Sequence, residues 1–134
     1  MDLAQFDLKA AADKGMSVTL IHPITQETLV DKDGKNVSIK VMGKDSSTWT
    51  ATAKRLDTKN ANKHRNKKVP TADLEKSILE ILAACTVSWT NVVYNEEVLK
   101  CSRNNALMLY QNRGWVAEQV LEAATERQNY DLKS

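Results

Sequence analysis

The sequence predicts an α+β fold that is mostly helical, with an N-terminal antiparallel β-meander packed on a helical bundle. Glycine and proline are scarce, 4 and 2 in 134 residues, which favours long helices over an all-β fold with many tight turns. Within residues 17–42, the segments 17–22 and 36–41 alternate between apolar and polar side chains, whereas most of residues 46–134 have helical periodicity. The length suits one hydrophobic core, so we interpret residues 1–134 as a single domain.

An amphipathic helical arm is predicted within residues 1–15. Asp2 can cap a helix that ends at Lys14, and Gly15 follows as the usual glycine stop. A helix this short is not stable alone, so we expect the arm to dock on another surface.

The β-meander is predicted over residues 17–42, with strands at 17–22, 29–30 and 36–41. Residues 31–34 form a turn signal, because Gly34 can adopt positive φ. A sheet this small needs a helix packed on its apolar face.

A helix from Ser47 to about Leu56, reaching as far as Ala61, should follow, with Asp45 or Ser46 as its cap. Basic residues accumulate toward its end, and we expect a basic loop at 59–69.

The most apolar long segment, residues 71–90, is predicted to form the central helix, capped by Thr71. Its apolar face is wide, so more than one element must cover it. The residues on that face are Leu74, Ile78, Ile81, Leu82, Cys85 and Trp89.

Two further helices are predicted after a connector at 91–100. The first spans residues 103–113 and is capped by Ser102. Gly114 breaks it, and Trp115 can pack back on the last turn as in a Schellman cap. The second runs from Val116 to about Gln128.

Motifs for catalysis or cofactor binding are not recognisable, so we expect a protein that is not an enzyme and has no cofactor. His22, His64, Cys85 and Cys101 could supply zinc ligands, but they lack the close pairing of zinc modules, and no metal is expected. We expect reduced thiols, with a disulfide as the less favoured alternative. Neither a signal peptide nor a membrane-spanning run is evident, which predicts a soluble intracellular protein.

The basic run spans residues 54–68, and its candidate binding residues are Lys63, Arg65, Lys67 and Lys68. Three interpretations remain open: a solvated loop, a protein-contact patch, or a site for nucleic acid. The absence of interleaved aromatic residues weakens the last of these.

Glu118, Glu122 and Glu126 stand four residues apart and would form an acidic ridge on the last helix. Like charges at this spacing repel by about 0.2–0.5 kcal/mol per pair, which suggests a basic partner. The basic run, in the same subunit or in a neighbour, is the obvious candidate. The alternative is an exposed ridge that tolerates the repulsion.

Trp49, Trp89 and Trp115 sit among apolar residues at helical spacing, and Leu82 lies on the central apolar face. Core packing is one use for these side chains, and anchoring a partner helix in a groove is the other. With the basic run and the acidic ridge, they are the candidate protein-binding residues.

Seven segments together resemble the small tail-module proteins of long-tailed phages and prophages. These segments are residues 6–15, 18–25, 31–35, 39–46, 82–89, 102–106 and 115–120. The similarity spans nearly the whole chain, and its motifs are structural rather than catalytic. The family that it indicates is the phage tail assembly chaperones.

The resemblance implies a non-enzymatic role in the host cytoplasm. Such chaperones coat the long, helical tape measure protein, help bring tail tube subunits to it, and are absent from the finished tail. Self-association is expected and membrane binding is not. One alternative is a structural tail or connector subunit retained in the virion. Another is a small phage nucleic-acid-binding regulator that uses residues 63–68.

Overall fold

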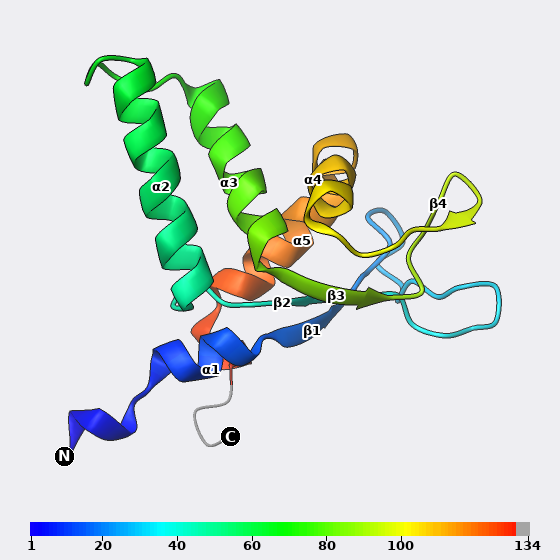
Figure 1. Cartoon of the computed structure of the whole chain (residues 1–134). Helices are drawn as coiled ribbons and strands as arrows, with labels where there is room; N and C mark the ends of the chain where they lie inside the picture. Colours follow the sequence, from blue (N-terminus) through cyan, green and yellow to red (C-terminus); the bar gives the residue numbers. More distant parts are fainter. Residues whose placement is uncertain (131–134) are drawn as a thin grey trace.

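The computed structural model describes residues 1–130 and confirms an α+β fold (Figure 1). The helices are α1 (Leu8–Lys14), α2 (Ser47–Lys63), α3 (Thr71–Cys85), α4 (Arg103–Asn112) and α5 (Gly114–Thr125), with short 3-10 helices at Leu3–Gln5 and Arg127–Asn129. The strands are β1 (Met16–Thr19), β2 (Ser38–Val41), β3 (Thr86–Thr90), β4 (Val93–Tyr94) and β5 (Glu97–Val98).

The main sheet has the antiparallel order β1-β2-β3, so the predicted N-terminal meander is only partly correct. Two strands come from the expected region, but the third follows α3. Residues 20–37 form a long loop instead of additional strands, held by isolated bridges between Ile21 and Thr28 and between Val30 and Asn36.

The predicted helix over 71–90 is wrong beyond Cys85. The last five residues, Thr86–Thr90, pair with β2, and Trp89 lies opposite Ile39. These residues are β-branched, aromatic or small, a composition that favours a strand, although Trp89 continued the helical spacing of the apolar residues. Thr71 is not a cap either, since Pro70 takes the N-cap position without a side-chain hydrogen bond.

The N-terminal arm is divided into two pieces, because each has its own cap. Asp2 accepts a hydrogen bond from the backbone N–H of Ala4, and Asp7 accepts one from that of Ala10. Gly15 ends α1 with a φ of 77°, as predicted.

Helix α2 is longer than expected. Ser46 caps it, as one of the two predicted candidates, and the helix continues to Lys63. Residues 59–63 of the predicted basic loop are therefore helical, and only 64–70 connect α2 to α3. Arg65 and Asn66 adopt positive φ values of 51° and 63° in this tight connection.

The predicted helical part, 46–134, also contains the β4–β5 hairpin, which replaces the expected irregular connector. Ser102 caps α4 as predicted. Gly114 does not form a Schellman cap, because it is the first residue of α5, which ends at Thr125 rather than near Gln128.

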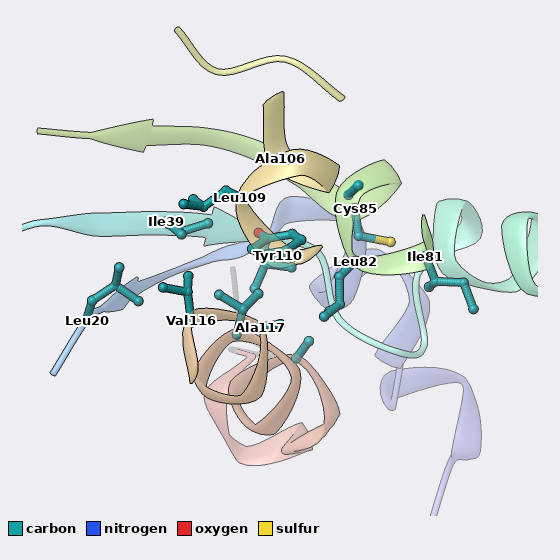
Figure 2. Packing of buried hydrophobic residues seen from close by; sticks show 14 of the residues in the cluster. Leu20, Ile39, Ile81, Leu82, Cys85, Ala106, Leu109, Tyr110, Val116 and Ala117 are labelled. Carbon is teal, nitrogen blue, oxygen red and sulfur yellow. The ribbon is translucent and has the colours of Figure 1, made fainter. Parts of the chain in front are cut away.

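The hydrophobic core lies between one face of the main sheet and helices α3, α4 and α5 (Figure 2). Ile39 and Val41 point into it from β2, as the alternation predicted, and are fully buried. Tyr110 of α4 is also buried, and its hydroxyl lies 2.6 Å from Thr86 Oγ1. Thr86 in turn donates to the carbonyl of Leu82, at the point where α3 becomes β3.

Helix α1 and the last described residue, Tyr130, meet at Gly43. Its N–H donates to the Ala12 carbonyl of α1, and the Tyr130 hydroxyl donates to the adjacent Val41 carbonyl. The next residue, Lys44, donates its N–H to Ala124 of α5. A Cβ at position 43 would lie 2.9 Å from the Tyr130 ring, so the close approach requires glycine.

Candidate partner-binding surfaces

A hollow of about 810 Å³ lies where the 20–37 loop, the β4–β5 hairpin and the α4–α5 junction meet. We call it the apolar groove, because aliphatic and aromatic side chains form most of its lining. Leu20, Leu109 and Val116 also belong to the core, so the groove is an outward continuation of it. A concave apolar surface of this size is typical of ligand and peptide sites.

The first wall of the apolar groove is the 20–37 loop, which is fixed by hydrogen bonds despite its length. The Leu20 carbonyl accepts a hydrogen bond from the Leu29 N–H, and the Leu20 N–H donates to the Val37 carbonyl. The Gln119 side chain of α5 then pairs with both backbone groups of Ile21, at 2.9 Å and 2.8 Å. This amide acts like a neighbouring strand and fastens the loop to the helix.

The second wall is the β4–β5 hairpin, which has a tight turn at Asn95 and Glu96 with φ values of 52° and 67°. Trp89 anchors the base of the hairpin by donating its indole N–H to the Leu99 carbonyl at 2.7 Å. Val93 remains 54% exposed and Val98 84% exposed. Both side chains line the groove, so this wall exposes apolar area to solvent.

The floor is completed at the α4–α5 junction. Trp115 is half-buried and lines the groove, and Arg113 lies over the Tyr94 ring, 5.4 Å from its centroid. This cation–π contact ties the junction to the hairpin. Of the predicted aromatic anchors, Trp115 therefore contacts the groove directly, whereas Trp89 only supports its wall.

The remaining two apolar candidates lie elsewhere. Leu82 is fully buried at the centre of the core, so its side chain cannot touch a partner in this conformation. Trp49 is half-buried on α2 and packs against the core. On α3, it is instead Leu74 and Ile78, near the free end of the helix, that remain exposed.

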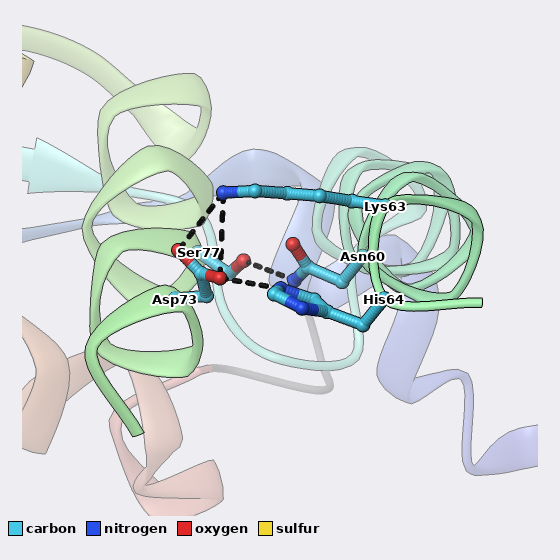
Figure 3. Close-up of polar contacts among 5 residues, drawn as sticks. All are labelled: Asn60, Lys63, His64, Asp73 and Ser77. Atoms are coloured by element: carbon cyan, nitrogen blue, oxygen red, sulfur yellow. Dashed lines mark hydrogen bonds and ion pairs between the residues drawn. The ribbon is translucent and has the colours of Figure 1, made fainter. Parts of the chain in front are cut away.

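The α2–α3 hairpin projects from the sheet and is closed at its free end by polar contacts (Figure 3). His64 Nε2 donates to Asp73 at 2.6 Å, and Lys63 pairs with the same carboxylate at 3.4 Å. The hydrogen bond from His64, followed by the charge of Lys63, holds the pKa of Asp73 below its usual value. Asn60 donates to Ser77 one turn further along the hairpin.

The predicted basic and acidic residues do not meet within one chain. Lys63 pairs with Asp73, while Arg65, Lys67 and Lys68 are exposed in the α2–α3 connection. Glu118 and Glu122 are exposed on α5. Glu126 lies past the end of that helix, where it accepts a hydrogen bond from the Gln128 N–H.

The two cysteines are free thiols. Burial raises the pKa of Cys85 to about 11, and it also raises the pKa of Cys101, so neither thiol is activated as a nucleophile. Within residues 1–130, three or more His, Cys, Asp or Glu side chains do not gather anywhere in a way that could hold a metal ion.

No α-helix in the described part of the chain combines the length and apolar character needed to cross a membrane. Comparisons with protein-family models, curated proteins and solved structures gave no match to this chain.

Proposed function

We propose that this chain is a phage tail assembly chaperone that binds apolar helical segments of a tape measure protein and helps recruit tail tube subunits. The observation that supports the proposal most directly is the apolar groove, an open concave surface with unpaired aliphatic side chains on its hairpin wall. A chaperone for an amphipathic helix needs such a surface, because the groove removes the apolar face of the helix from water.

The walls of the groove suit this role because they are preorganised. The hydrogen bonds of the Gln119 side chain fix the 20–37 loop, and the indole hydrogen bond of Trp89 fixes the β4–β5 hairpin, before a partner binds. A preformed site loses less conformational entropy on binding, which increases affinity for a given contact area. The resemblance described above is the reason for naming the tape measure protein as the partner, and the exposed apolar lining supports the groove as its binding place.

The test is co-purification of this chain with the tape measure protein of the same phage genome. Val93→Asp puts a charge on the groove wall and should abolish the complex. Val87→Asp is the matched control, because Val87 is similarly exposed, at 48% against 54%, lies on β3 and does not line the groove. Circular dichroism should show both variants folded. Equal retention of the partner by both variants would contradict the proposed site.

Mass spectrometry of purified particles separates the proposed role from that of a retained tail or connector subunit. A chaperone should be absent from the virion, whereas a structural subunit should be abundant. A nucleic-acid-binding regulator would instead show DNA affinity that falls steeply with salt. Abundance in the virion, or DNA affinity that falls steeply with salt, would refute the proposal.

A further inference from the structure

One end of the molecule carries a concentration of positive charge. We call residues 59–68, the end of α2 and the turn after it, the basic tip. It contains five basic residues, and residues 58–72 include no acidic side chain. Asp73 binds Lys63, but Arg65, Lys67 and Lys68 extend beyond that pair and are exposed.

A second hollow, of about 490 Å³, lies between β1 and α5 and has the opposite charge. We call it the acidic groove. Glu122 and Glu126 line it, and no lysine or arginine does. Val18 and Ile21 give it apolar area, and Glu118 is exposed one turn earlier on α5. Among residues 1–130, Glu118 and Glu122 have no ion-pair partner.

These two surfaces cannot meet within one copy. Helix α2 begins beside α5, where the Lys44 N–H donates to the Ala124 carbonyl at 3.0 Å. The helix then runs for 17 residues, about 25 Å at 1.5 Å per residue, and only its last five residues, 59–63, belong to the basic tip. The hairpin contact with α3 fixes its direction away from the sheet (Figure 1).

We propose that the basic tip of one copy binds the acidic groove of a second copy. The charges are complementary, and a salt bridge between exposed groups adds specificity and orientation to a contact between surfaces. The two surfaces differ, so the contact is heterologous, and a pair of copies keeps one free tip and one free groove. Copies therefore join head to tail, whether or not the chain acts as a chaperone.

The experiment measures the mass of the full chain in solution by light scattering, over a range of concentrations, in 50 mM and 500 mM NaCl. The tip variant is K67E/K68E, which leaves the Lys63 pair with Asp73 intact. The groove variant is E118K/E122K. The control is K32E/K35E, which makes the same change in charge at two exposed loop lysines.

We expect the mass of the wild type and the control to rise with concentration at low salt, and to fall to that of a monomer at high salt because exposed charges are screened. Each interface variant alone should remain monomeric. A 1:1 mixture of the two should recover the association, since the reversed tip then meets the reversed groove. A monomeric wild type at low salt, association that persists in 500 mM NaCl, or a mixture that stays monomeric would overturn the proposal.

Discussion

Replacing Thr86 with valine should destabilise the protein more than replacing Tyr110 with phenylalanine, although the two hydroxyls bond each other. Thr86 donates to the Leu82 carbonyl at 2.8 Å, so its oxygen accepts from the Tyr110 hydroxyl at 2.6 Å. Thr86→Val removes both bonds and leaves the buried hydroxyl of Tyr110 without its partner. Tyr110→Phe removes only one bond and takes away the polar group itself.

The expected costs follow from this asymmetry. Tyr110→Phe should lower the free energy of unfolding by about 1 kcal/mol, the usual value of one hydrogen bond. Thr86→Val should lower it by about 2–4 kcal/mol, because an unpaired buried polar group adds its own penalty. In the double variant that penalty disappears, so the total should fall short of the sum of the single effects by about 1 kcal/mol or more.

Urea unfolding followed by tryptophan fluorescence measures these differences. Thr90→Val is the control, since Thr90 is an exposed residue on the same strand and should change stability by less than about 0.5 kcal/mol. Equal costs for Thr86→Val and Tyr110→Phe, or strictly additive effects in the double variant, would refute the conclusion that the buried Tyr110 hydroxyl depends on Thr86 for its hydrogen bond.

Three further predictions concern packing, the groove wall and pH. Gly43→Ala should cost about 1–3 kcal/mol in thermal or urea unfolding, because its Cβ would collide with a buried ring, whereas Gly114→Ala, at an open helical position, should be neutral or stabilising. Gln119→Ala should raise amide hydrogen exchange across residues 20–37 and weaken partner binding, with Gln128→Ala leaving both unchanged. The Cys85 thiol has its pKa raised from 9.0 to about 11 in the folded state, so its contribution to stability is complete below pH 9 and is lost as pH rises toward 11. Cys85→Ala should flatten the decline in urea midpoint over that window, and an unchanged slope would contradict this account.

Local patterns predicted much of the fold. The caps at Ser46 and Ser102, the glycine stop at Gly15 and the inward face of β2 follow from short-range rules, and each is confirmed. Such features depend on a few neighbouring residues, so one sequence contains enough information to place them.

The errors arose where distant contacts decide the conformation. Thr86–Thr90 fit both a helix and a strand, and pairing with β2 favours the strand. The β-branched and aromatic residues of this segment were the signal in the sequence that favoured a strand. The β4–β5 hairpin turns at Asn95 and Glu96, without the glycine that usually marks such a turn. The sequence of the connector therefore did not predict a hairpin.

The candidate surfaces were the hardest features to predict. Sequence periodicity left Trp115 between core packing and a groove anchor, and in the structure it is half-buried and lines the apolar groove. The wall of that groove depends on Gln119 bonding to Ile21, two residues 98 positions apart, and no local pattern could have shown this. The basic and acidic residues can be read from the sequence, but the distance between the two groups became visible only from the length and direction of α2.

The junction of α1, β2 and Tyr130 around Gly43 has a consequence for synthesis in the cell. A ribosome releases the first helix and the sheet long before Ala124 and Tyr130, yet those later residues complete the contacts around Gly43. A nascent chain can therefore form its local helices early, but it cannot complete this junction until residue 130 has left the ribosome. A chain that stops before Ala124 would lack the bond from Lys44 to Ala124 and the bond from Tyr130 to Val41, so β2 and the segment after it would be held less firmly.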